Sequence, residues 1–226
     1  MPHKLYGALG GHEACSAGLW LGLAKMEIDW ALSQGVQPII VGGTGLYLKA
    51  LMQGIADIPA IAPEVRAQAT GDYDIMGKDA FMARLREIDP GFFERLKVYD
   101  RQRLIRAYEV WLGSGKSLSW WQARIVIPPY ESGRFQVHKI MPTREELYAR
   151  CDARVLTMVE QGAVDEVKAL LLQQFSLDLP IMKSLGVSEF TAYIRGDIAL
   201  DQAISQTQQA TRNYAKRQMT WLHNQL

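Results

Sequence analysis

The sequence has little cysteine, no long apolar run and almost no net charge, and each shortage excludes a class of protein. Its two cysteines, Cys15 and Cys151, lack the CxxC spacing of metal and redox sites, and the four histidines include no i, i+4 pair. This pattern argues against a zinc site and favours a reducing, cytoplasmic compartment. The longest apolar stretches, around 19–24 and 39–41, are far shorter than the roughly 20 residues of a membrane-spanning helix. We therefore expect a protein that does not cross a membrane.

Charge is nearly balanced, with 25 basic residues, 24 acidic residues and a formal net charge of +1. Overall charge therefore points to no polyanionic partner, and any nucleic-acid-binding surface must be a local patch. The 226 residues, 48% of them hydrophobic, are enough for one or two globular domains.

The spacing of apolar residues predicts both helices and strands. A helix is predicted over 16–34, a short buried strand over 37–41, and another helix after the turn at Gly42–Gly45. A second strand pattern appears at 135–140, whereas 64–121 contains only helical patterns and a last helix begins near residue 200. Helix, strand, glycine turn and helix is the order of an α/β fold. Because most sheets have more than two strands, the predicted sheet is incomplete.

Domain boundaries follow from where the strand patterns stop. We predict that residues 1–57 and 135–226 form the remainder of an α/β core with C-terminal helices, and that residues 58–134 form a helical insertion domain. Polar residues mark helix starts: Ser16 and Asp100 are predicted N-caps, and Thr143–Glu146 is a predicted capping box.

Two glycine-rich segments are candidates for phosphate binding. Gly42–Gly45 follows a strand pattern and opens a helix, where free backbone N–H groups can bind an anion, and Thr44 adds a hydroxyl group. A tight turn without a ligand is the simpler alternative. Gly113–Ser117 resembles the end of a P-loop, but the full pattern needs a glycine where Val110 stands, and the segment follows a helix instead of a strand. We interpret this second segment as a helix-ending loop.

Basic residues gather in two helical segments. The first has one acid and five basic residues: Arg95, Lys97, Arg101, Arg103 and Arg106. The second is the last helix, which has no acid after Asp201 and contains Arg212, Lys216, Arg217, Trp221 and His223. Clustered cations near an aromatic ring suit RNA binding. A solvated helix face and a tryptophan in the core are the alternatives.

Several segments occur together in one order: Pro2–Leu5 (PHKL), Pro38–Tyr47 (PIIVGGTGLY), Pro63–Arg66 (PEVR), Asp100–Val110 (DRQRLIRAYEV) and Thr211–Trp221 (TRNYAKRQMTW). In type and spacing they resemble the tRNA dimethylallyltransferases, also called tRNA isopentenyltransferases. The resemblance covers essentially the whole chain. It implies a P-loop NTPase-like core with a parallel sheet and a mostly α-helical insertion domain.

The resemblance also implies a reaction. Such enzymes transfer a dimethylallyl group from dimethylallyl diphosphate to N6 of the adenosine 3′-adjacent to the anticodon, in tRNAs that read codons beginning with U. A P-loop of the nucleotide-binding type and Mg²⁺ hold the departing diphosphate, and an aspartate is the general base. The implied partners are the anticodon stem-loop of tRNA and dimethylallyl diphosphate, and the implied state is a cytoplasmic monomer.

Residue by residue, the match implies that Thr44 and Arg66 lie beside the reacting groups. The implied tRNA-binding residues are Gln102, Arg103, Leu104, Ile105, Arg106, Lys183, Gly186, Lys216, Arg217, Gln218 and Trp221.

Parts of the family's pattern are missing. The sequence contains no GxxxxGK[ST] loop and no D-S-x-Q segment with the general-base aspartate. Residues 183–189 read KSLGVSE, where the family has RxxGY[KR]E, so one expected tRNA contact is altered. We expect the chain to be the C-terminal part of such an enzyme and inactive alone; a non-catalytic tRNA- or partner-binding protein is the alternative.

Overall fold

The computed structural model describes residues 2–95, 100–131 and 133–225. Lys97, part of the predicted basic segment, lies outside them. The chain divides into two compact units, Met1–Met52 with Pro129–Leu226, and Gln53–Pro128. The sequence placed these divisions a few residues later in each case, at 57/58 and 134/135.

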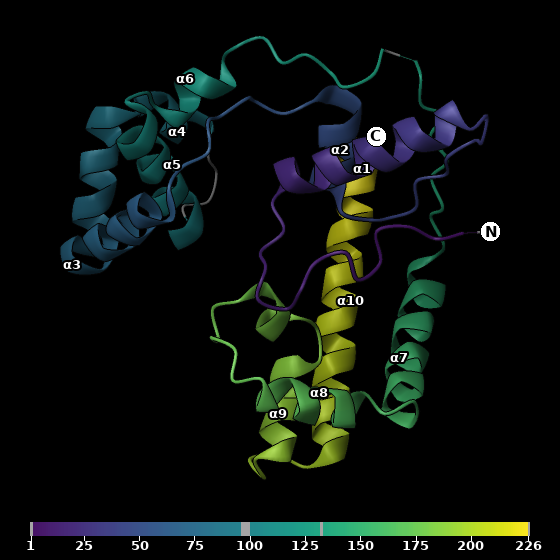
Figure 1. Cartoon of the computed structure of the whole chain (residues 1–226). Helices are drawn as coiled ribbons and strands as arrows, with labels where there is room; N and C mark the ends of the chain where they lie inside the picture. Colours follow the sequence, from purple (N-terminus) through teal and green to yellow (C-terminus); the bar gives the residue numbers. More distant parts are fainter. Residues whose placement is uncertain (1, 96–99, 132, 226) are drawn as a thin grey trace. The chain divides into compact units, whose positions relative to one another are not determined.

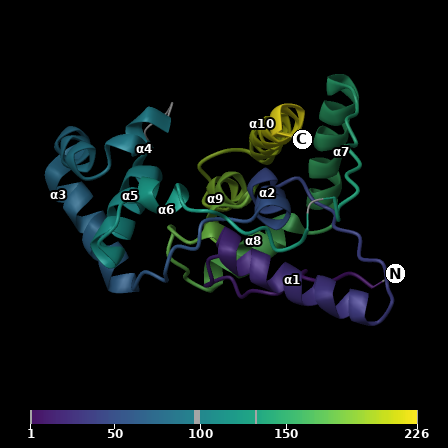
Figure 2. The same ribbon diagram turned by 90° about the horizontal axis from the view of Figure 1, so that it is seen from above.

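Helices make up the first unit. Their bounds are α1 (Ala17–Ser33), α2 (Gly45–Gln53), α7 (Arg144–Glu160), α8 (Ala163–Leu172), the 3-10 helix η1 (Pro180–Lys183), α9 (Val187–Ile194) and α10 (Leu200–Gln225). The long helix α10 packs against α7 and α9, and α8 packs against α9 (Figures 1 and 2). Phe190 of α9 and Ala203 of α10 lie in the hydrophobic core that these helices share with η1.

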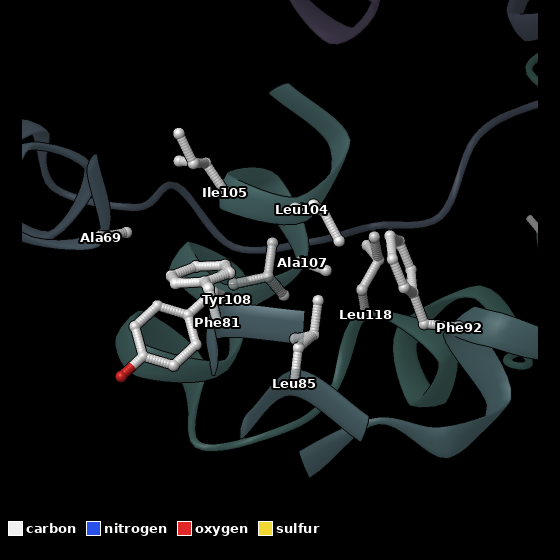
Figure 3. Packing of buried hydrophobic residues seen from close by; sticks show 10 residues of the cluster. Ala69, Phe81, Leu85, Phe92, Leu104, Ile105, Ala107, Tyr108 and Leu118 are labelled. Carbon is white, nitrogen blue, oxygen red and sulfur yellow. The ribbon is translucent and has the colours of Figure 1, made fainter. Parts of the chain in front are cut away.

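The second unit has its own core. It consists of α3 (Pro63–Ile88), α4 (Pro90–Arg95), α5 (Arg101–Ser114) and α6 (Leu118–Gln122). Helix α3 kinks at Gly77, whose φ of 73° lies in the left-handed region, where glycine carries no Cβ penalty. Beyond the kink Phe81 packs against Tyr108 of α5, with ring centroids 4.8 Å apart, and Leu85 lies below them (Figure 3).

The predicted helix starts are confirmed. Ser16 accepts a hydrogen bond from the Leu19 N–H (3.1 Å), and Asp100 accepts one from the Arg103 N–H (2.9 Å). At α7 both halves of the capping box form, between the Thr143 hydroxyl and the Glu146 N–H and between the Glu146 carboxylate and the Thr143 N–H. These contacts satisfy N–H groups that have no partner inside the helix.

The prediction of a parallel sheet is wrong for the part of the chain that the structure describes. Neither 37–41 nor 135–140 forms a strand there. Apolar side chains that the pattern placed in a buried sheet are exposed, including Ile39 (68%), Val41 (85%) and Ile140 (82%). A strand requires a neighbouring backbone to pair with, and an apolar run in the sequence does not supply one.

Among the described residues, no helix combines the length and apolar character needed to cross a bilayer.

Candidate functional site

Thr44 lies at the N-terminus of α2. Its carbonyl oxygen accepts hydrogen bonds from the N–H groups of Tyr47 (2.9 Å) and Leu48 (3.2 Å), which start the helix. Its side chain is exposed. The hydroxyl group therefore faces solvent at a helix terminus where backbone N–H groups favour negative charge.

Two side chains of α10 pack closely against the glycines around Thr44. A Cβ on Gly43 would lie 2.5 Å from Nε2 of Gln218, and a Cβ on Gly45 would collide with the indole ring of Trp221. From the sequence, Gly42–Gly45 was a candidate for anion binding, with a tight turn without a ligand as the simpler alternative. The structure instead brings the loop against α10, so the predicted catalytic Thr44 lies beside two predicted tRNA-binding residues.

Tyr47 connects the same loop to the start of α1. Its ring stacks on Trp20 with centroids 4.9 Å apart, and its hydroxyl donates a hydrogen bond to the Cys15 carbonyl oxygen (3.4 Å). The Cys15 side chain, followed by partial burial, raises the pKa of Tyr47 to about 12. Tyr47 therefore stays a neutral donor at physiological pH and fixes α2 where its N-terminus meets α10.

One face of α10 near its C-terminal end is basic and open. Lys216 and Arg217 are exposed, and Trp221 is half-buried. Residues spaced three and four apart line an open hollow of about 510 Å³: Asn213, Lys216, Arg217, Thr220, Trp221, Asn224 and Gln225. One ammonium group and one guanidinium group beside an indole ring suit the phosphates and bases of an unpaired nucleic-acid strand.

Asp152 of α7 makes polar contacts with two residues of α10. Arg212 forms an ion pair with the Asp152 carboxylate, and the Gln208 side-chain amide donates to the Asp152 carbonyl oxygen (3.1 Å). The Arg212 side chain is only 21% exposed, so it joins the two helices and contributes little to the basic face.

In the second unit, residues 102–106 of α5 divide into an exposed and a buried set. Gln102 and Arg103 are exposed, and Arg103 forms an ion pair with Asp100 (3.2 Å). Leu104 and Ile105 are 0% and 4% exposed and pack in the hydrophobic core. Their side chains support the helix and leave its polar residues at the surface.

Arg66 and Arg106, predicted for different roles, meet at Glu109. Arg66 Nη1 of α3 lies 3.2 Å from Glu109 Oε2, and Arg106 Nη1 of α5 donates to Glu109 Oε1. Sequence reasoning missed Glu109. The signal was available, because an acid within the apolar stripe of α5 needs a cationic partner when it is buried.

Lys183 and Gly186 lie at the start of α9. Lys183 ends η1 and forms an ion pair with Asp178 (3.5 Å). Gly186 caps α9 with a φ of 91°, and a Cβ there would lie 3.1 Å from the Phe190 ring. The left-handed backbone and the close ring both explain glycine at this position without a ligand.

Neither a metal site nor a P-loop emerges from the described residues. They contain no group of three or more His, Cys, Asp or Glu side chains placed to hold a metal ion. Gly115 ends α5 with a φ of 67°, and Ser117 caps α6. The segment Gly113–Ser117 is thus the predicted helix-ending loop.

Comparisons with known proteins match nearly the whole chain. A family model described as IPP transferase matches residues 1–225. A tRNA dimethylallyltransferase of Rhodospirillum rubrum is 46% identical over 225 residues, which are 100% of this chain and 69% of that protein. The crystal structure of a tRNA isopentenylpyrophosphate transferase from Bacillus halodurans covers 99% of this chain and 69% of its own, with 29% identity and a TM-score of 0.60. A eukaryotic dimethylallyltransferase acting on tRNA shares the fold, with a TM-score of 0.74 at 22% identity over 94% of this chain and 54% of its own.

Proposed function

The chain belongs to the IPP transferase family, and we propose that its two basic helical surfaces bind the tRNA that receives a dimethylallyl group. The first surface is the exposed polar side of α5 with Arg66, and the second is the basic face of α10 with the Thr44 loop. Each is described within its own unit. We thus assign to the described residues the binding of the acceptor, which is the tRNA that receives the dimethylallyl group.

The proposed acceptor is N6 of the adenosine 3′-adjacent to the anticodon, in tRNAs that read codons beginning with U. The N6 nitrogen forms a bond to C1 of dimethylallyl diphosphate, the bond from C1 to the diphosphate oxygen breaks, and N6 loses a proton. The adenine must leave its stack to expose N6. Stacking on Trp221 and phosphate contacts from Lys216 and Arg217 would hold the anticodon loop in such an opened state.

The packing of the Thr44 loop against α10 is the observation that carries this proposal. Gly45 admits the Trp221 ring, and Gln218 lies against Gly43. A hydroxyl group, an amide and an aromatic ring are therefore assembled beside exposed cations. Such a set can bind an unstacked base and its flanking phosphates together.

The diphosphate side of the reaction has no counterpart among these residues. The sequence has no GxxxxGK[ST] motif, and the described residues contain no group of three or more His, Cys, Asp or Glu side chains placed to hold a metal ion. We propose that the 226-residue chain binds tRNA as a monomer and does not transfer the dimethylallyl group alone. The same observation favours a second candidate, an RNA-binding protein of this family without catalysis.

A paired assay tests the proposal. The purified chain is mixed with a tRNA that reads codons beginning with U, dimethylallyl diphosphate and Mg²⁺; gel shift and dimethylallyl incorporation are both measured. We expect a shift that weakens with added salt and no incorporation. Robust incorporation would contradict the assignment to the acceptor side alone, and an absent or salt-insensitive shift would contradict tRNA binding.

A further inference from the structure

Glu109 is a buried carboxylate whose position packing alone does not explain. It is 2% exposed in the middle of α5, between Tyr108 and Val110 of the hydrophobic core. Removing a carboxylate from water is costly unless charged partners replace its hydration. The partners here are two guanidinium groups, and both belong to residues that we assign to tRNA binding.

The two arginines reach the carboxylate from different helices. Arg66 comes from the first turn of α3 and binds Oε2 at 3.2 Å, while Arg106 lies one turn before Glu109 on α5 and binds Oε1. Each carboxylate oxygen thus takes one guanidinium group. The two cations are held next to each other in spite of their mutual repulsion, and together with the carboxylate they carry one net positive charge.

Both arginines also keep a solvent-facing side. The Arg66 and Arg106 side chains are 58% and 42% exposed, whereas the Glu109 side chain is 3% exposed. A guanidinium group has five N–H donors in a fixed plane, and the ion pair directs one Nη1 of each inward. The outward donors of two neighbouring guanidinium groups match the oxygens of a phosphate.

We propose that Glu109 is a positioning residue that holds Arg66 and Arg106 side by side as a two-arginine clamp for an RNA phosphate. The inference rests on the proposed function and adds a residue that touches no RNA itself. Fixing two long side chains before binding reduces the conformational entropy that they lose on binding. The simpler alternative is that Glu109 is a counter-ion of the two arginines that joins α3 to α5 and does not help them bind RNA.

The substitution Glu109→Gln distinguishes these two roles, because each predicts a change of opposite sign in the affinity for RNA. It keeps the shape of the side chain and raises the net charge by one. A mere counter-ion would, once neutralised, leave two freer cations and tighter RNA binding. If Glu109 positions the arginines, binding weakens on the order of tenfold in spite of the added positive charge.

Asp89→Asn is the matched control. Asp89 is also a 2% exposed carboxylate of the same unit, but it accepts hydrogen bonds from the N–H groups of Phe92 (3.1 Å) and Ser119 (2.9 Å) and has no assigned role in binding. The control adds the same unit of charge and removes a buried carboxylate. It should lower the melting temperature and leave the dissociation constant for tRNA within about twofold, the scale of its small electrostatic effect.

The experiment measures the dissociation constant for a tRNA reading codons beginning with U, with the full chain and its variants, alongside circular dichroism melting curves. We expect weaker binding for Glu109→Gln, and no further weakening when the same substitution is made in an Arg66→Ala/Arg106→Ala background. If Glu109→Gln does not fold, Glu109→Asp provides the test, since it keeps the charge and shortens the reach; an intermediate loss is expected.

Binding by Glu109→Gln as tight as that of the unaltered chain, or tighter, overturns this inference alone. So does an equal loss in Asp89→Asn, or a full additional loss in the double-alanine background. Equal binding by Glu109→Asp overturns it where Glu109→Gln is unfolded. Failure of the unaltered chain to bind tRNA contradicts the proposed function itself, and the inference with it.

Discussion

Gly45 opens α2 directly beneath the indole ring of Trp221, and any Cβ at this position would collide with that ring. The indole is bulky and half-buried, so displacing it costs more free energy than displacing a flexible side-chain end. This one residue therefore determines how closely the Thr44 loop approaches the basic face of α10.

We predict that Gly45→Ala displaces Trp221 and costs about 1–3 kcal/mol in the free energy of unfolding, the usual range for overpacking. The displaced ring should also weaken tRNA binding. Tryptophan fluorescence and chemical denaturation measure the two effects. Gly42→Ala is the control, because nothing lies within 4 Å of a Cβ at that position; similar losses in both variants would show that the close approach of Trp221 is not the cause.

At the scale of single residues, the sequence predicted which side chains are exposed better than it predicted their partners. Gln102 and Arg103 lie at the surface as an RNA-binding role requires. The resemblance placed Leu104 and Ile105 with the tRNA-binding residues, whereas both side chains are buried in the hydrophobic core. Glu109 was missed because its partner Arg66 is 43 residues away, and spacing within one helix carries no information about a second helix.

At the scale of elements, the accuracy of prediction depended on whether an element is stabilised locally. The helix starting at Arg144 was predictable because its capping box is formed by residues three positions apart. The strands at 37–41 and 135–140 were not, because a strand forms only by pairing with a distant segment. The apolar, β-branched pattern at Ile39–Val41 describes side chains, and the structure leaves two of them largely exposed.

The contact between α2 and the start of α1 predicts a pH dependence. The Cys15 side chain, followed by partial burial, raises the pKa of Tyr47 from 10.0 to about 12. A raised pKa means that the folded state binds this proton more tightly than the unfolded state does. The stabilisation that the Tyr47 hydroxyl contributes is therefore fully present below pH 10 and is lost as the pH rises to about 12. Tyr47→Phe should therefore be less stable than the unaltered chain at neutral pH, and the difference should shrink over this window.

Thermal melting of both chains from pH 8 to about 12 measures the effect. Tyr6→Phe is the control, since the Tyr6 side chain is 80% exposed, and its melting curves should follow those of the unaltered chain throughout. A difference between Tyr47→Phe and the unaltered chain that stays constant up to the highest pH would contradict a raised pKa of Tyr47 in the folded chain.

At the scale of the whole molecule, the described residues form two hydrophobic cores, and each lies within one unit. Phe81 and Leu85 belong to the core of Gln53–Pro128, whereas Phe190 and Ala203 belong to the core of the other unit. Cores that share no residue allow the two units to unfold separately. The sequence indicated two units because residues 64–121 have only helical patterns, so a sheet predicted from the flanking segments could not include them.

We predict that Phe81→Ala and Phe190→Ala each destabilise only their own unit, by about 3–5 kcal/mol for a fully buried phenylalanine. The two residues are 0% and 1% exposed, so they form a matched pair. Hydrogen exchange measured by mass spectrometry reports each unit separately. An equal increase of exchange in both units on either substitution would show that the chain unfolds as one cooperative body.

The central claim is that the basic face of α10 binds tRNA, and its salt dependence tests this most directly. The dissociation constant for an anticodon stem-loop is measured over a series of salt concentrations for the unaltered chain, Lys216→Ala/Arg217→Ala, and the control Lys168→Ala, which removes a cation paired with Asp165 on α8. We predict that the double variant reduces the slope of log K against log salt by about 1–2, while the control leaves it unchanged. An unchanged slope in the double variant, or no binding by the unaltered chain, would contradict the account.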